Sequence, residues 1–283
     1  MLTNAMRFHK YQALGNDYLV LETAGGRALI PGLVRRICNR HFGLGSDGIL
    51  LEAPPGPGAR FGLRILNPDG SEAEKSGNGL RIFARYLWDE GRVNAAPFIV
   101  STPGGDVTCQ IRDGGQQVFV EMGSASFDSA RIPVAGQPRE VLGETLAVGN
   151  ESLRFTAVTV GNPHCVVHVD EVSPELAQRL GPILETHPLF PNRTNVQLVK
   201  VLGRQHLQIE IWERGAGYTL ASGSSSCAAA AASVRLGLCE REVTVSMPGG
   251  DLQIGVSAEY ALTMLGPVQK VAEGTLAAEL LTK

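Results

Sequence analysis

The sequence predicts an α/β protein made of two similar halves, each a set of strands wrapped around one central apolar helix. Residues 77–88 and 223–236 each follow a small, Gly-rich turn and carry apolar residues at helical spacing. Short apolar segments bounded by Gly and Pro surround both of them, as is typical of strands. The two halves also repeat the same motifs in the same order. We therefore expect a duplicated domain, with one buried helix in each copy.

Composition excludes several other classes of protein. The chain has 283 residues, of which 43% are hydrophobic and 19% charged, and a net charge of −3 without a basic run. These values are typical of a globular domain and argue against nucleic acid as a partner. We expect no membrane span, and residues 1–10 do not resemble a signal peptide. Five cysteines without a C-x-x-C pair favour free thiols in a reducing, cytoplasmic setting.

The repeat has a nearly constant offset. Ser222 follows Ser76 by 146 residues, and the same distance separates Gly161-Asn162 from Gly15-Asn16. Residues 100–106 recur as residues 245–251, and the helical segment 31–42 matches 177–188. Each motif alone is a common turn sequence, but several matched motifs in one order indicate duplication. Repeats of this length are domains and not solenoid units.

Other elements follow from local patterns. Gly43 to Gly48 matches G-x-G-x-x-G, but a helix precedes it and a strand follows, which favours a tight turn over a dinucleotide site. Ser173 before Pro174 predicts a helix start. Strands are predicted, in chain order, over residues 8–22 (two strands around a Gly-Asn turn), 49–52, 61–66, 98–111, 117–122, 153–160, 165–169, 207–212 and 262–271.

Each central helix begins at a small, polar turn, residues 74–81 in the first half and 220–227 in the second. Such a helix start leaves backbone N–H groups unpaired and carries partial positive charge. It can therefore bind a carboxylate or phosphate. We expect the two starts to face each other and to hold one small anionic substrate between them.

The motifs resemble those of the diaminopimelate epimerases, in the group of amino-acid racemases that work without pyridoxal phosphate. The resemblance covers nearly the whole chain. It rests on residues 13–18 (ALGNDY), 40–48 (RHFGLGSDG), 67–81 (NPDGSEAEKSGNGLR), 161–165 (GNPHC), 190–195 (FPNRTN) and 213–217 (ERGAG).

The resemblance implies a fold of two pseudo-symmetric lobes with the active site in the cleft between them. Each lobe is a curled, mostly antiparallel sheet or barrel around a central helix. It suggests boundaries at residues 1–124 and 125–267, with the C-terminal strand, 268–283, returning to the first lobe. It also implies a homodimer, a role in lysine biosynthesis, an amino-acid substrate, and neither organic cofactor nor metal.

Catalysis in this family uses two cysteines, one at the head of each central helix. One thiolate removes the α-proton, and the other thiol delivers a proton to the opposite face. This chain has Ser76 and Ser222 at those places. A hydroxyl is a far weaker acid than a thiol and needs an adjacent base. The resemblance places His164 and Glu213 beside the reacting centre as candidate helpers, although His164 could instead be a neutral turn residue.

The substrate-holding set is complete. The resemblance assigns side-chain contacts to Asn16, Asn67, Asn162, Asn195 and Arg214, and a backbone cradle for the α-carboxylate to Gly77, Asn78, Gly223 and Ser224. A guanidinium suits a second carboxylate because it donates two parallel hydrogen bonds. Each Asn alone could be only a turn former.

Three hypotheses remain open. The chain is a diaminopimelate-type epimerase that works with serines or has lost turnover at them; or a paralogue that isomerises or dehydrates another amino acid; or a binding protein that kept the pocket. The two serines could also be deliberate replacements of the thiols, made to trap a substrate complex. Further departures from the family pattern, at Lys75, Tyr218 and Ser225, favour natural divergence of the site.

Overall fold

The computed structural model describes residues 6–22, 29–149 and 151–282, which divide into two compact units. Unit 1 comprises Met1–Val120 and Gly266–Lys283, and unit 2 comprises Glu121–Leu265. The expectation about a signal peptide falls partly on residues 1–5, which lie outside the described ranges. The predicted α/β class is confirmed: strands predominate in both units, and each contains one long buried helix.

The described residues of unit 1 form strands, three α-helices and a short 3-10 turn. In chain order these are β1 (Arg7–Ala13), β2 (Asn16–Glu22), α1 (Pro31–Cys38), β3 (Ile49–Ala53), β4 (Phe61–Leu66), β5 (Glu72–Ala73), α2 (Gly77–Asp89), β6 (Phe98–Thr102), β7 (Gly105–Arg112), η2 (Asp113–Gly115), β18 (Gln269–Thr275) and α5 (Ala278–Leu281). Strand β8 (Gln117–Ser124) leads from unit 1 into unit 2, and β17 (Ala261–Pro267) leads back.

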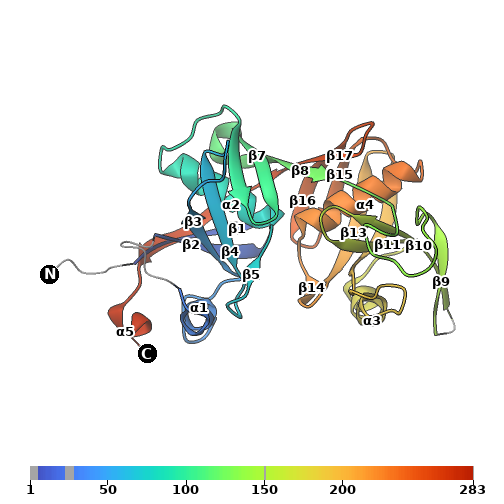
Figure 1. Cartoon of the computed structure of the whole chain (residues 1–283), viewed down its shortest axis with the longest axis horizontal. Helices are drawn as coiled ribbons and strands as arrows, with labels where there is room; N and C mark the ends of the chain where they lie inside the picture. The colour runs from blue at the N-terminus through green and yellow to red at the C-terminus, as the bar shows by residue number, and fades with distance from the viewer. Residues whose placement is uncertain (1–5, 23–28, 150, 283) are drawn as a thin grey trace. The chain divides into compact units, whose positions relative to one another are not determined.

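Unit 2 repeats this order. Its elements are β9 (Glu144–Val148), β10 (Glu151–Thr159), β11 (Pro163–His168), α3 (Pro174–Glu185), β12 (Asn195–Gly203), β13 (His206–Glu213), β14 (Gly217–Thr219), α4 (Gly223–Arg235), β15 (Glu242–Met247) and β16 (Gly250–Val256). Figure 1 shows β3, β4 and β7 drawn around α2, and β13, β15 and β16 drawn around α4.

Strand pairing shows the duplication directly. In unit 1, β1–β2, β3–β4, β6–β7 and β7–β8 are antiparallel, whereas β2–β3 and β4–β6 are parallel. In unit 2, β10–β11, β12–β13, β15–β16 and β16–β17 are antiparallel, whereas β11–β12 and β13–β15 are parallel. One strand is added to each copy: β18 pairs with β1, and β9 pairs with β10. The two units therefore share one mixed, mostly antiparallel pattern.

The two central helices are the cores of their units. Helix α2 buries Leu80, Ile82, Phe83 and Leu87, and also the charged side chain of Arg81. Helix α4 buries the whole run of Ala228–Ala232, because small side chains let strands approach the helix from all sides. The apolar core predicted for both helices is confirmed, although α2 also buries Arg81 and Asn78, and α4 also buries Ser225, Ser226 and Ser233.

Several local predictions need correction. The helix expected over residues 31–42 ends at Cys38, because Asn39 Oδ1 accepts hydrogen bonds from the backbone N–H groups of His41 and Phe42. The single strand expected over 262–271 is two strands that meet around Pro267. Strands β5, β9, β12 and β14 were not predicted: β5 and β14 span only two and three residues, and β12 begins with a continuous buried run.

Candidate active site

Ser76 and Ser222 are the N-caps of α2 and α4, in nearly the same backbone conformation. Their φ and ψ angles are −142° and 121° for Ser76, and −147° and 123° for Ser222. Ser76 Oγ accepts from the Gly79 N–H at 3.0 Å, and Ser222 Oγ accepts from the Ser225 N–H at 3.4 Å. A capping oxygen of this kind satisfies one of the free amides at a helix start. Each hydroxyl therefore lies at the positive end of its helix.

The backbone predicted to cradle a carboxylate lies in the first turn of these helices. Gly77, Asn78 and Gly223 are buried, and Ser224 is half-buried. Neither first turn contains an acidic residue that would compete for the amides. The two helix starts have the charge and the small side chains that an anion site needs.

In unit 1, Asn16 and Asn78 are joined through their side chains. Asn16 Oδ1 accepts from Asn78 Nδ2 at 3.0 Å, and Asn78 Oδ1 accepts from the buried Arg81 guanidinium at 2.9 Å. Asn16 Nδ2 in turn donates to Asp47 Oδ2 at 2.9 Å. The structure thus brings two predicted ligands together and shows what orients them.

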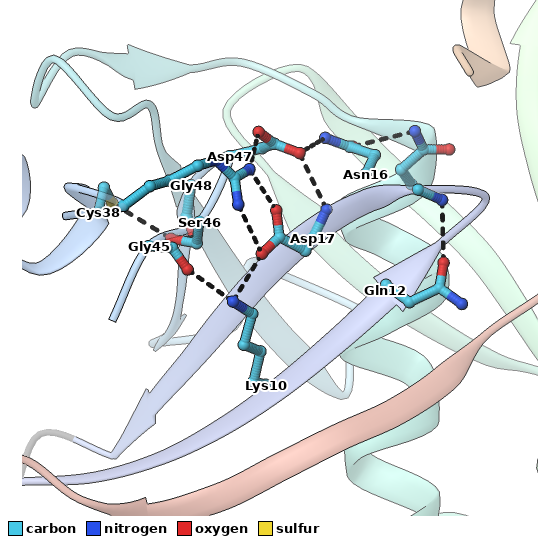
Figure 2. A network of polar contacts seen from close by, with 12 residues as sticks. Lys10, Gln12, Asn16, Asp17, Cys38, Gly45, Ser46, Asp47 and Gly48 are labelled. Atoms are coloured by element: carbon cyan, nitrogen blue, oxygen red, sulfur yellow. Dashed lines mark hydrogen bonds and ion pairs between the residues drawn. The ribbon is translucent and has the colours of Figure 1, made fainter. Parts of the chain in front are cut away.

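Charged residues lie beside Asn16, among them Lys10, Asp17 and Asp47 in Figure 2. Arg40 donates to Asp17 and to Asp47 at 2.7 Å each, and Lys10 Nζ lies 2.9 Å from Asp17. Burial alone would raise the pKa of Asp17, but the hydrogen bonds from Arg40 and Lys10 outweigh it and hold that pKa below its usual range. Asp17 therefore stays ionised and fixes the strand end that carries Asn16.

Asn67, the other predicted ligand of unit 1, is held within its own turn. Its backbone N–H donates to the Ser71 carbonyl at 2.8 Å, and its side-chain amide donates to Ser71 Oγ at 3.0 Å. These are the contacts of a turn former. The geometry of Asn67 is thus explained without a ligand.

In unit 2, His164 is fully buried, and its Nε2 lies 2.9 Å from Asn162 Oδ1. Because that oxygen is an acceptor, Nε2 carries the ring proton. Burial lowers the pKa of His164 to about 3. The imidazole is therefore neutral near pH 7. Within the described ranges it forms no hydrogen bond with Ser222, whose Oγ lies 3.4 Å from Ser224 Oγ.

Asn195 links two further strand ends of unit 2. Its side-chain amide donates to the Pro163 carbonyl at 2.9 Å, and its Oδ1 accepts from the Arg214 N–H at 2.9 Å. The guanidinium of Arg214 is exposed and donates to the Asn192 carbonyl at 3.1 Å. Glu213, half-buried, ends β13 directly before it. The structure therefore gathers Asn162, His164, Asn195 and Arg214 around the start of β11.

Glu185, which sequence reasoning missed, anchors the turn after β13. This buried carboxylate at the end of α3 accepts from the Trp212 indole at 2.7 Å and the Gly215 N–H at 3.0 Å. Arg193 donates to it at 3.3 Å. It joins the two motifs that carry Asn195 and Arg214. The sequence signal is weak, because a glutamate near a helix end is usually solvated.

Two other residues have structural explanations. His168 Nε2 lies 2.9 Å from Ser233 Oγ, and burial lowers its pKa to about 4. Tyr218 donates to Glu210 Oε2 at 2.7 Å. Burial raises the pKa of Glu210 above its usual range.

The structure shows neither a metal cluster nor a spanning helix in the residues it covers. Within residues 6–22, 29–149 and 151–282, three or more His, Cys, Asp or Glu side chains nowhere gather in a way that could hold a metal ion. In the same part of the chain, each helix is too short or too polar to cross a bilayer.

Comparison with known proteins identifies the family. The family model described as diaminopimelate epimerase matches residues 8–128 and 156–271. Diaminopimelate epimerase 2 of a Nostoc species is 55% identical over 276 residues, which are 97% of both chains. Diaminopimelate epimerase of Moorella thermoacetica is 42% identical over 275 residues, covering 95% of this chain and 98% of that one.

Solved structures share the fold at low sequence identity. A hydroxyproline epimerase from Agrobacterium vitis has a TM-score of 0.71 and 17% identity, and covers 98% of this chain and 93% of its own. A phenazine biosynthesis protein of Bacillus anthracis has a TM-score of 0.69 and 15% identity, with coverages of 96% and 99%. From its matched motifs, its relatives and its fold, the chain belongs to the diaminopimelate epimerase family.

Proposed function

We propose that this protein is an isomerase that interconverts LL- and meso-2,6-diaminopimelate by proton transfer, without a cofactor. One observation carries the proposal: Ser76 and Ser222 cap two equivalent helices, at the places where the family resemblance expects its two acid–base residues. Residues 1–124 with 268–283 would supply Ser76, and residues 125–267 would supply Ser222.

Substrate recognition would use the polar groups around these caps. The amides of Gly77, Asn78, Gly223 and Ser224 would bind the α-carboxylate, as expected at helix starts. The five predicted side-chain ligands would hold the amino groups and the distal carboxylate: Asn16, Asn67, Asn162, Asn195 and Arg214. The exposed guanidinium of Arg214 supports its role, because it can donate two parallel hydrogen bonds to a carboxylate.

Because serines stand in place of the two thiols, we expect this enzyme to be slow. General acid–base catalysis contributes about 10²–10⁴-fold and works best when the pKa of the group is near the working pH. The pKa of a serine hydroxyl lies further from the working pH than the pKa of a thiol does. Each serine oxygen also accepts a hydrogen bond from a backbone N–H of its helix, which makes the oxygen a weaker base. Proton removal would therefore limit turnover.

His164 and Glu213 would assist from unit 2. The neutral ring of His164 holds the side chain of Asn162 through Nε2 and would orient it toward the substrate. Glu213, half-buried beside Arg214, carries a carboxylate that could accept a proton directly or through water. Both roles require that the bound substrate lie against the start of β11.

Proton exchange tests the proposal against the two alternatives. The protein is incubated in ²H₂O with LL-diaminopimelate and, separately, with other amino acids, and α-deuterium is measured by NMR. Exchange into diaminopimelate supports the proposal. Exchange only into another amino acid supports a paralogue, and saturable calorimetric binding without exchange supports a binding protein.

We also infer a homodimer in the cytoplasm with a place in lysine biosynthesis. The family resemblance supports the dimer and the pathway, and the five free, buried cysteines suit a reducing compartment. Sedimentation equilibrium measures the mass directly. A monomer over the micromolar range would contradict the dimer.

A further inference from the structure

Tyr18 lies beneath one end of helix α2, at the N-cap. It is paired directly with Tyr11 across β1 and β2, so the two rings lie on the same face of the sheet. Tyr11 donates to Asp89 at 2.9 Å, at the last residue of α2. The Tyr18 hydroxyl lies 3.4 Å from Oγ of Ser76, which is the N-cap of the same helix. Both rings are buried, with exposures of 0% for Tyr11 and 7% for Tyr18.

The ring of Tyr18 is held in place by a glycine. A Cβ on Gly48 would lie 2.6 Å from Tyr18 Cε1 and 2.7 Å from the Leu66 carbonyl oxygen, both far closer than packing allows. Gly48 also accepts the Leu19 N–H through its carbonyl at 3.1 Å. The last glycine of the G-x-G-x-x-G segment thus makes room for this ring. Close packing of the ring against Gly48 therefore positions the Tyr18 hydroxyl next to Ser76.

The hydroxyl of Ser76 is suited to a second partner. Its oxygen accepts from the Gly79 N–H and keeps one further lone pair and one proton. A distance of 3.4 Å is long for O–H···O, but catalytic hydrogen bonds often tighten only when substrate is bound. An unperturbed phenol has a pKa of about 10, much nearer the working pH than that of an aliphatic alcohol.

We propose that Tyr18 is the acid–base partner of Ser76, which deepens the function proposed above and rests on it. When unit 1 delivers the proton, the Ser76 O–H bond breaks and a C–H bond forms at the substrate carbanion. The Tyr18 O–H proton moves to Ser76 Oγ, and water returns a proton to the phenolate. In the other direction, the phenolate receives the serine proton as Ser76 takes the α-proton. No electrons are exchanged.

The repeat places His164 at the position equivalent to Tyr18, 146 residues further on. The two rings have different partners. Nε2 of His164 is bonded to Asn162, whereas the hydroxyl of Tyr18 faces the capping serine itself. The structure therefore assigns a direct proton partner to Ser76 of unit 1.

A thiol at position 76 tests the contact between Tyr18 and residue 76 by a measurement that does not depend on catalytic turnover. Ser76→Cys is combined with Tyr18→Phe or with the control Tyr11→Phe, and iodoacetamide alkylation is followed against pH. The five native thiols are buried, and the parent protein gives their background rate. Losing one hydrogen bond to a thiolate should raise its pKa by about one unit and slow alkylation about tenfold at pH 7.

We expect this change with Tyr18→Phe, and less than a twofold change with Tyr11→Phe. Equal effects of the two, or no effect of Tyr18→Phe in a variant that keeps its melting temperature, would overturn the pairing. An effect on the thiol without α-proton exchange in the serine protein would overturn the proposed function and leave the pairing in place.

Turnover of the serine protein then tests the chemical role. Tyr18→Phe should lower kcat for α-proton exchange about 10²-fold with little change in KM, because general acid–base partners act in the transition state. A rise in KM alone, or an unchanged kcat, would overturn the role.

Discussion

The starts of α2 and α4 have the same backbone but different surroundings. Ser76 is half-buried beside a tyrosine hydroxyl, and unit 1 also contains the ion pair of Asp17 and Arg40. Ser222 has an exposure of only 4%, and its Oγ lies 3.4 Å from the Ser224 hydroxyl. The duplication has therefore kept the cap and changed the group beside it. In unit 1 the capping oxygen meets a phenol, and in unit 2 it meets a second serine.

A second equivalent pair shows the same divergence. Arg64 and Glu72 form a two-fold hydrogen-bonded ion pair at 2.8 and 2.9 Å across β4 and β5. At the positions 146 residues later, Glu210 accepts from the Tyr218 hydroxyl at 2.7 Å. The pair in unit 1 is solvated, whereas Glu210 is buried. Strand pairing is thus preserved while the side chains that bridge it are replaced.

The largest expected effect comes from restoring thiols at the two caps. Ser76→Cys and Ser222→Cys should each raise the rate of α-proton exchange by about 10²–10⁴-fold, since a thiolate is accessible near neutral pH. Exchange into LL-diaminopimelate, followed by NMR in ²H₂O, measures both. The exposed Ser124→Cys is the control. If neither cap responds, the caps are not the acid–base groups.

Acid should unfold unit 2 before unit 1. His164 and His168 have pKa values of about 3 and about 4 when folded, so below about pH 6.5 the unfolded chain binds more protons than the folded one. Their stabilisation is complete above pH 6.5 and falls by roughly 1.4 kcal/mol per pH unit for each histidine until its folded pKa is reached.

Asp17 in unit 1 also loses its stabilising charge in acid, but only below the ordinary pKa of a carboxyl, about 3.9. Hydrogen exchange at pH 7 and pH 4.5, resolved by peptide, measures the two units separately. Equal loss of protection in both would contradict the comparison.

Substituting a buried carboxylate should destabilise the protein more than substituting a solvated one. Glu185→Gln should cost about 1–3 kcal/mol of unfolding free energy, because it weakens three hydrogen bonds to a buried group. Asp47→Asn, in the half-exposed network of unit 1, should cost less than about 1 kcal/mol. Urea unfolding measures both, and Trp212 fluorescence should shift only in the Glu185 variant. A larger loss at Asp47 would reverse the assignment.

The smallest expected effect is at the strand-bridging pairs. Tyr218→Phe removes the donor to buried Glu210 and should cost about 1–2 kcal/mol. Arg64→Met breaks an exposed ion pair and should cost about 0–1 kcal/mol. Thermal unfolding followed by circular dichroism compares them. Similar values would mean that burial does not separate these pairs.

Much of the fold could be read from sequence patterns because the patterns are local. The caps Ser76, Ser173 and Ser222 precede apolar helices, and each accepts a hydrogen bond from the helix it starts. Strand β12 was missed because its segment, Asn195–Gly203, follows a polar turn and its inner residues form a continuous buried run without alternation.

The candidate site was predictable only in part. Asn16, Asn78, Asn162 and Asn195 lie in motifs, and their side chains are well placed. Glu185 lies outside these motifs, and Tyr18 ends the motif 13–18 without an expected role in the site. Their importance depends on contacts with residues 58 and 27–30 positions away, which no local pattern reports.

The sequence alone determined the duplication, the two capped apolar helices and the family, because these depend on periodicity and on motifs of adjacent residues. Only the tertiary structure decided which side chains meet. It put a tyrosine at one capping serine, a neutral histidine against Asn162, and a buried glutamate under the turn that carries Arg214. The physical reason is that protonation and hydrogen bonding depend on burial and on neighbours distant in the chain.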